Sequence, residues 1–249
     1  MITDSMVVDV SQDWAVACDL QERFMEVPYA KTQRLTYSAR CRQMRALGGD
    51  CFTFLPLADR RVALAVADAS GKGLPAALLI ANVQASLRTA ALFAPGDVAE
   101  VVTAVNRQLY ACSPTDRYAT LFYGVFGENT RTLHYVNAGH NPAMLIRSDG
   151  AITWLEAGAP PVGFFADTVY EPRTVRLNAA DLIVAYTDGI VEATNTAGDE
   201  WGALGLLAAV TRCQMRQPDR IVQAAFEALD QFSEDNQTDD ATILAALVN

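Results

Sequence analysis

The sequence predicts an α+β sandwich in which antiparallel sheets are covered by helices. Alternating apolar segments are joined by tight turns, as where 119–127 and 131–138 flank Glu128-Asn129-Thr130. Segments with helical periodicity come in two pairs, at 74–92 and 98–111 and again at 203–213 and 218–232. Further strands are expected at 35–42, within 47–56, and at 62–67, 143–147, 151–155, 174–177, 181–186 and 241–248.

Composition and charge limit the classes of function. The 249 residues are 51% hydrophobic and 19% charged, which fits one large domain or one domain with a short appendage. A net charge of -10 argues against a nucleic-acid partner, because neutralising phosphates needs Lys and Arg. We expect a soluble, cytoplasmic protein with no membrane contact, because no apolar run reaches transmembrane length and the N-terminus lacks a basic, signal-like region. The odd, scattered cysteines predict buried thiols in a reducing compartment: Cys18, Cys41, Cys51, Cys112 and Cys213.

The first predicted element is an amphipathic helix over residues 10–26, which Pro28 ends. Its apolar stripe has three- and four-residue spacing and comprises Val10, Trp14, Ala17, Leu20 and Phe24. Two interpretations stay open: the helix packs on its own domain, or it couples the domain to a partner or a second copy. We therefore divide the chain into an N-terminal helix and linker, 1–30, and one domain, 31–249.

An aspartate ends the central predicted strand. Val62, Leu64 and Val66 alternate with alanines, so this strand can be buried on both faces before it reaches Asp68. A carboxylate at the end of a buried strand is costly unless a cation meets it. Either Lys72 folds back on Asp68 or a metal ion lies there. The intervening SGKG turn is no phosphate-binding P-loop, because the glycine before it and the Ser or Thr after it are missing.

Three further aspartates lie at the boundaries of apolar strands. Asp50 follows Gly48-Gly49, which permits a close backbone approach; Asp188 follows the strand 181–186; and Asp239 precedes the strand 241–248. Clustered carboxylates raise one another's pKa values unless cations neutralise them. Oxygen-only ligands select hard ions such as Mg²⁺ or Mn²⁺. The spacing alone leaves a dinuclear site and a single structural ion equally open.

Five ordered motifs between Leu35 and Val248 carry a family resemblance. They are GGD at 48–50, DASGKGLPAALL at 68–79, NAGHNP at 137–142, YTDGIVEA at 186–193 and TDDAT at 238–242. Together they resemble the metal-dependent protein phosphatase superfamily of the 2C class. More narrowly, they are similar to its bacterial branch that regulates sigma factors, the sporulation stage II E-like phosphatases.

The resemblance implies a four-layer α-β-β-α sandwich with two Mn²⁺ or Mg²⁺ ions between the sheets. Asp68 would bridge both ions, and the backbone carbonyl of Ala69 would bind the second. Asp188 and Asp239 would complete the shell of the first ion, and Asp50 would hold the second directly or through water. Asp68, Asp188 and Asp239 would thereby support attack of a metal-bridging hydroxide on phosphoserine or phosphothreonine, with no cysteine nucleophile.

The same resemblance implies a phosphoprotein substrate, namely a phosphorylated STAS-domain antagonist of an anti-sigma factor. An activating partner or self-association through the 10–26 helix is expected as well. The alternative is a non-catalytic regulatory module that keeps the fold and binds a partner. Such a module should have lost at least one metal-binding aspartate, and all four are present.

Several positions depart from the family pattern. Thr53 replaces a second acidic residue, and Ser70 stands where eukaryotic relatives have histidine, so the general acid is unassigned. Lys72 would contact phosphate or only stabilise its turn. His140 lies in the tight turn after Ala138, and the expected role of such a histidine is to hydrogen-bond that turn, with metal binding as the alternative.

Overall fold

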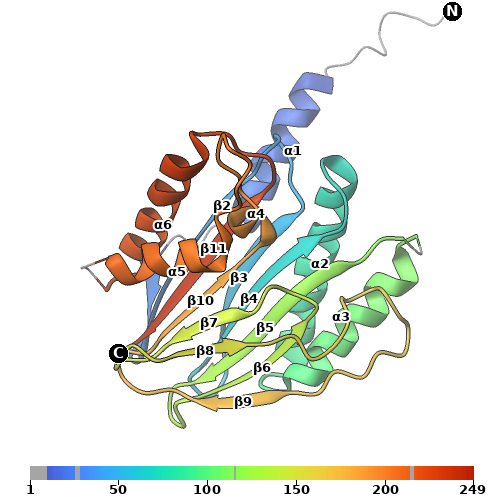
Figure 1. Ribbon diagram of the computed structural model, residues 1–249. Coiled ribbons are helices and arrows are strands. Elements are labelled where there is room, and N and C mark those ends of the chain that lie inside the picture. The colour runs from blue at the N-terminus through green and yellow to red at the C-terminus, as the bar shows by residue number, and fades with distance from the viewer. Residues whose placement is uncertain (1–9, 26–28, 115, 214–215) are drawn as a thin grey trace, which may run out of the picture.

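The computed structural model describes residues 10–25, 29–114, 116–213 and 216–249, which form two antiparallel sheets (Figure 1). The six-stranded sheet contains, in spatial order, β1 (Tyr29–Lys31), β2 (Leu35–Arg42), β11 (Ala241–Val248), β10 (Leu182–Tyr186), β7 (Ala143–Ile146) and β8 (Ile152–Leu155). The five-stranded sheet contains β3 (Asp50–Leu57), β4 (Arg61–Ala69), β5 (Ala119–Gly127), β6 (Thr132–Ala138) and β9 (Arg173–Arg176). The predicted strands are confirmed, and β1 is an addition.

Helices cover the outer face of each sheet. The helices are α1 (Val10–Phe24), α2 (Leu74–Phe93), α3 (Val98–Cys112), α4 (Asp188–Val191), α5 (Gly202–Arg212) and α6 (Pro218–Ser233). The pair α2 and α3 packs on the five-stranded sheet, and α5 and α6 pack on the six-stranded sheet. The predicted four-layer α-β-β-α sandwich is therefore confirmed.

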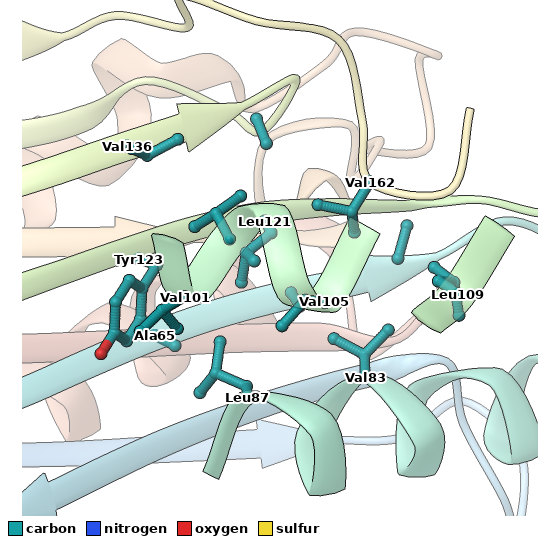
Figure 2. Close-up of a cluster of buried hydrophobic side chains, with 14 of the residues drawn as sticks. Ala65, Val83, Leu87, Val101, Val105, Leu109, Leu121, Tyr123, Val136 and Val162 are labelled. Carbon is teal, nitrogen blue, oxygen red and sulfur yellow. The ribbon is translucent and has the colours of Figure 1, made fainter. Parts of the chain in front are cut away.

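Three clusters of buried apolar side chains fill the spaces between the four layers. The middle cluster lies between the sheets, and each outer cluster lies between one sheet and its helices. Figure 2 shows the cluster beneath α2 and α3, where Val83 and Leu87 of α2 meet Val101 and Val105 of α3. Both faces of the five-stranded sheet are thus buried, as a continuous apolar strand pattern requires.

Strand β4 shows how the sequence assigns these faces. Its larger residues, Val62, Leu64 and Val66, enter the cluster between the sheets, whereas the alanines between them face the helices. The turn before β4 spans residues 58–60, and two of them, Asp59 and Arg60, have positive φ (58° and 56°), a conformation common in short hairpin loops. Strand β4 is consequently held between β3 and β5 along its full length, up to Asp68.

Helix α2 corrects one expectation about membranes. It has 20 residues and a mean hydropathy of 1.4, so by length and composition it could cross a membrane, and the expectation that no apolar run is this long was wrong. Its apolar residues have another explanation, because Ile80, Val83 and Leu87 are buried against the five-stranded sheet and α3. The core helix of a globular domain passes the same test of length and composition.

Helix α1 projects from one end of the sandwich (Figure 1). Much of its predicted apolar stripe is exposed, with Trp14, Leu20 and Phe24 at 39%, 48% and 41%. It docks instead through the buried Gln21, whose amide donates to the Gly48 carbonyl (2.7 Å) and accepts from the Gly48 N–H (3.1 Å). The side chain of Val10 and the predicted break at Pro28 lie outside the described residues.

Candidate metal centre

Asp50 and Asp68 lie side by side on neighbouring strands. They are register partners in the β3–β4 ladder, and Thr120 of β5 is the next partner of Asp68. Gly49 makes the close approach that the sequence suggested: a Cβ on this residue would lie 3.1 Å from the Ala69 carbonyl oxygen. Glycine at this position therefore lets the backbone pack closely against the Ala69 carbonyl, next to the two carboxylates.

Asp188 and Asp239 come from the other sheet. Asp188 is the first residue of α4, directly after β10, and Asp239 lies just before β11, which pairs with β10. Gly189 brings the two segments into contact, because a Cβ there would lie 2.0 Å from the Asp240 carbonyl oxygen and 3.2 Å from the Asp239 Cβ. The backbone around Asp188 and Asp239 is thus closely packed.

Two threonine hydroxyls join the sheets at Asp50. Thr187, after β10, and Thr242, in β11, each donate a hydrogen bond of 2.7 Å to the same oxygen, Oδ2, of Asp50. The N–H of Thr242 in turn donates to the Thr187 hydroxyl (2.9 Å). Sequence analysis missed both threonines, although each lies within three residues of a predicted aspartate at a strand boundary.

The electrostatics of the site show carboxylates without enough positive charge. Burial raises the pKa of Asp50 to about 8, although the two threonine hydroxyls oppose this shift. Burial, and then the charges of Asp50, Asp188 and Asp239, raise the pKa of Asp68 to about 9. Burial and the nearby Asp239 also raise the pKa of Asp188. Burial and like charges both raise the pKa of a carboxyl, and a cation bound among these groups would favour their charged forms.

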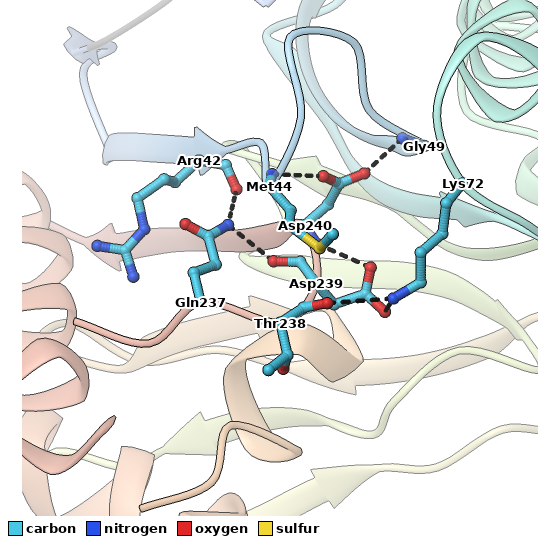
Figure 3. Close-up of polar contacts among 8 residues, drawn as sticks. All are labelled: Arg42, Met44, Gly49, Lys72, Gln237, Thr238, Asp239 and Asp240. Carbon is cyan, nitrogen blue, oxygen red and sulfur yellow. Dashed lines mark hydrogen bonds and ion pairs between the residues drawn. The ribbon is translucent and has the colours of Figure 1, made fainter. Parts of the chain in front are cut away.

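Lys72 is the one cation that pairs with these aspartates in the described ranges, and it does not pair with Asp68. Its ammonium lies 2.6 Å from Oδ2 of Asp239 and donates to the Thr238 carbonyl at 3.2 Å (Figure 3). No ion pair reaches Asp50, Asp68 or Asp188 in this part of the chain. The proposal that a strand-end carboxylate needs a cation therefore still applies to Asp68.

The oxygen atoms of these residues are suitable ligands for hard divalent ions, although the side chains are not arranged around a single ion position. Within the described residues no group of three or more His, Cys, Asp or Glu side chains is arranged to hold a metal ion. The carboxylates nevertheless share one end of the sandwich, as the charge interactions of Asp68 with Asp50, Asp188 and Asp239 require. Carboxylate and backbone carbonyl oxygens, such as that of Ala69, are the ligands that Mg²⁺ and Mn²⁺ prefer.

Asp240 has a structural role. It is 8% exposed and accepts hydrogen bonds from the N–H groups of Met44 (2.7 Å) and Gly49 (2.6 Å), while its own N–H donates to Oδ1 of Asp239 (2.9 Å; Figure 3). A Cβ on Gly48 would lie 2.5 Å from the Asp240 carboxylate. Asp240 therefore fixes the Gly48-Gly49 loop that precedes Asp50.

The residues that depart from the family pattern stabilise the surroundings of the site. Buried Thr53 accepts a hydrogen bond from the Gln84 amide (3.1 Å), which ties β3 to α2. The Ser70 hydroxyl accepts from the N–H of Tyr118 (3.0 Å), which fixes the turn after β4. Neither contact positions a general acid.

His140 is buried in the turn between β6 and β7. The ring Nδ1 lies 2.7 Å from the Thr120 hydroxyl, and the backbone N–H of His140 donates to the side-chain oxygen of Asn137 at 2.8 Å. Burial lowers the pKa of His140 to about 4, so the imidazole is neutral. These contacts agree with the expected role of hydrogen-bonding the turn.

The cysteines differ in their surroundings more than the sequence suggested. All five are unbridged, but only Cys51 is fully buried, and Cys112 is exposed. Burial raises the pKa of the Cys51 and Cys41 thiols, so neither is a thiolate poised for attack.

Comparison with known proteins identifies the family. The sequence profile of the family "Stage II sporulation protein E (SpoIIE)" matches residues 58–249. The chain belongs to the SpoIIE family. Among curated SpoIIE-like relatives, the phosphoserine phosphatase RsbU of Bacillus subtilis is 23% identical over 192 residues, which cover 76% of this chain and 56% of RsbU. This chain spans between 17% and 56% of the length of four curated relatives that it matches.

Solved structures share the SpoIIE-type fold. The RsbU and RsbW domains of Rv1364c from Mycobacterium tuberculosis match with a TM-score of 0.71 and 29% identity, over 87% of this chain and 60% of that one. The SiaA PP2C domain of Pseudomonas aeruginosa matches with a TM-score of 0.82 and 16% identity, over 99% and 100%. Two further structures of this fold are RsbX in complex with magnesium, 16% identical, and the catalytic domain of the phosphatase PstP in complex with two manganese ions, 20% identical.

Proposed function

We propose that this chain is a metal-dependent phosphoserine/phosphothreonine protein phosphatase. One observation carries the proposal: carboxylates from both sheets meet at one end of the sandwich, where the pKa values of Asp50 and Asp68 are raised to about 8 and about 9 and no ion pair of the described residues reaches them. Family membership and the names of the matched phosphatases support the same activity.

The family resemblance supports the roles that we propose for the residues. We assign Asp68, Asp188 and Asp239 to one divalent ion, and Asp68, the Ala69 carbonyl and Asp50 to a second. Bound Mn²⁺ or Mg²⁺ supplies Lewis-acid activation of water and of a phosphoryl oxygen.

The protein supplies the orientation of these ligands. The β3–β4 register fixes the spacing of Asp50 and Asp68, and the hydroxyls of Thr187 and Thr242 fix the rotamer of Asp50. Glycine at position 49 lets the loop before Asp50 pack closely against the Ala69 carbonyl.

Hydrolysis of p-nitrophenyl phosphate tests the activity. We expect hydrolysis that requires Mn²⁺ or Mg²⁺, is abolished by EDTA, and falls at least 1000-fold in Asp68→Asn, on the order of the loss when a transition-state interaction is removed. Asp235→Asn removes the same charge from an exposed loop position and should retain activity. A folded wild-type chain that binds Mn²⁺ by calorimetry but hydrolyses neither this ester nor a phosphoprotein would contradict the proposal.

The substrate that we propose is a phosphorylated STAS-domain antagonist of an anti-sigma factor, as the family resemblance implies. We further propose that the exposed stripe of α1, with Trp14, Leu20 and Phe24, contacts an activating partner or a second copy of the chain. The matching division into residues 1–30 and 31–249 stays a prediction. A panel of phosphorylated STAS proteins, assayed with and without residues 1–28, tests both proposals.

The Lys72–Asp239 ion pair favours a second candidate, a regulatory module with weak or no catalysis. A lysine that neutralises one of the proposed ligands removes part of the need for a metal. Titration calorimetry separates the candidates, because the module should bind a protein partner while binding no Mn²⁺ at millimolar concentration.

A further inference from the structure

One buried side chain holds the loop between β8 and β9, which runs over α3 (Figure 1). The amide of Asn106, in α3, is fully buried and makes four hydrogen bonds to this loop. Its oxygen accepts from the Gly163 N–H (2.7 Å) and the Tyr170 hydroxyl (3.1 Å). Its nitrogen donates to the carbonyls of Phe165 (2.9 Å) and Ala166 (3.2 Å). The loop conformation from 163 to 170 is therefore set by the protein interior.

The residues just before this segment are fixed as well. Val162 pairs with Ala119 through two backbone hydrogen bonds of 2.9 Å and joins the cluster of Figure 2. Pro161 packs over Gly139, whose φ is +68° and where a Cβ would lie 2.6 Å from the proline ring. Only glycine accommodates both the backbone conformation and this contact. The loop is thus held at both ends and in its middle.

This fixed loop presents apolar side chains to solvent. Phe164, Phe165 and Val169 are 44%, 57% and 78% exposed. The ring of Phe164 makes edge contacts with Tyr118 (5.2 Å between centroids) and with Phe165 (4.7 Å). We call Tyr118, Phe164, Phe165 and Val169 the aromatic rim. Exposed aromatic rings on a rigid backbone give contact area at a low entropic cost, as binding surfaces do.

The aromatic rim is continuous with the proposed catalytic site. Tyr118 and Ser70 are joined by two hydrogen bonds, from the Tyr118 N–H to the Ser70 hydroxyl (3.0 Å) and from the Ser70 N–H to the Tyr118 carbonyl (2.8 Å). Ser70 is two residues beyond Asp68. Arg117 donates to the Ser70 carbonyl (3.2 Å) and places a positive charge beside the same turn. The rim therefore adjoins the turn that directly follows Asp68.

We propose that the aromatic rim binds an apolar side chain next to the phosphorylated residue of the protein substrate and so determines which phosphoproteins are hydrolysed. This inference rests on the proposed phosphatase activity. Small aryl phosphates have no residues flanking the phosphate, so the rim should affect phosphopeptide binding and leave the hydrolysis of aryl phosphates unchanged.

Synthetic phosphoserine peptides of equal length and charge provide the probe. One series has leucine on both sides of phosphoserine, and the other has serine at these positions. We expect the wild-type chain with Mn²⁺ to prefer the leucine series about fivefold to tenfold in kcat/KM, through KM, as a modest apolar contact provides. The double variant Phe164→Ser/Phe165→Ser should lose this preference and keep wild-type hydrolysis of p-nitrophenyl phosphate.

Phe93→Ser is the matched control, because Phe93 is 85% exposed at the end of α2 and lies outside the rim. It should keep both the preference and the activity. Equal kcat/KM for the two peptide series in the wild type would overturn the rim proposal while leaving the activity intact. Absence of hydrolysis of p-nitrophenyl phosphate by the wild type would instead count against the activity itself.

The aromatic rim could instead bind a membrane surface or a second copy of the chain, and the double variant distinguishes these two cases from peptide binding. Binding to phosphatidylglycerol vesicles that is lost in Phe164→Ser/Phe165→Ser would assign the rim to a membrane surface and overturn the proposal. A wild-type dimer that becomes monomeric in the same variant, seen by sedimentation, would assign it to self-association and overturn the proposal as well. We expect neither, because the chain carries a net charge of -10 and the rim borders the proposed site.

Discussion

The two halves of the acidic site are built differently. The strand pair, Asp50 and Asp68, belongs to the five-stranded sheet, where ladder register fixes its spacing and burial raises both pKa values. The loop pair, Asp188 and Asp239, belongs to the other sheet, begins α4 or precedes β11, and already has a lysine contact. The strand pair is thus a rigid receptor for positive charge, whereas the loop pair has a partner that can be exchanged.

The largest expected effect is the pH dependence of metal-free stability. Because the folded-state pKa values of Asp50 and Asp68 lie at about 8 and about 9, above the unfolded value, the folded chain holds extra protons between roughly pH 4 and pH 9. Stability in EDTA should therefore fall as pH rises through this range. We expect the melting temperature to drop by about 5 °C or more between pH 6 and pH 9.

Differential scanning fluorimetry in EDTA measures this drop. The control is Asp50→Asn/Asp68→Asn, in which both titrating carboxylates are gone and most of the slope should disappear. A wild-type melting temperature that rises from pH 6 to pH 9 would show that the strand pair is already compensated by a cation.

The next prediction compares one member of each half. Asp68→Asn should stabilise the metal-free chain at pH 7 by about 1–3 kcal/mol, because the raised pKa of Asp68 makes the carboxyl take up a proton on folding at this pH, whereas the amide takes up none. Asp239→Asn should give no gain, because it removes the partner of Lys72. Both variants should lose Mn²⁺-dependent hydrolysis. Thermal melts in EDTA measure the difference, and equal shifts in the two variants would remove the distinction between the halves.

The aspartates at the ends of buried strands were predictable from sequence because their cause is local. A buried apolar strand that ends in an aspartate, as at Asp68 and Asp188, has few physical explanations, and alternation within 62–67 predicted both burial and strand faces. The pairing of Asp50 with Asp68 does not follow from their spacing in the sequence, because it depends on the register of β3 against β4.

What sequence analysis missed depends on tertiary contacts. Strand β1 has three residues, too few for a periodicity to appear. The hydroxyls on Asp50 come from positions 137 and 192 residues away in the chain. The stripe of α1 was correctly identified as apolar, but its exposure follows from docking through Gln21, which no periodicity predicts.

The third prediction concerns the two threonines that donate hydrogen bonds to Asp50. Thr187→Val and Thr242→Val each remove one hydroxyl from Oδ2 of Asp50, so the carboxylate is less well oriented and harder to ionise. We expect Mn²⁺ affinity to fall about 10-fold for each, as is typical for partners of metal ligands. Thr36→Val is the control, because Thr36 is also buried but bonds Asn249. Calorimetric titration measures the Mn²⁺ affinity of each variant. Unchanged affinity in both threonine variants would show that Asp50 does not help to bind the ion.

The smallest effect is expected at Lys72, which forms an ion pair with the loop pair and not with the strand pair. Its pair with Asp239 is exposed, at 45% and 36% for the two side chains, so it contributes about 0–1 kcal/mol. Replacing Lys72 with methionine frees Asp239 for an ion, and Mn²⁺ affinity should rise up to about fivefold. The other lysine of the chain, Lys31, gives the control Lys31→Met, which should leave affinity unchanged. If Lys72→Met instead weakens Mn²⁺ binding, the Lys72 ammonium helps to position Asp239 and does not compete with the ion. The contrast between the strand pair and the loop pair would then be lost.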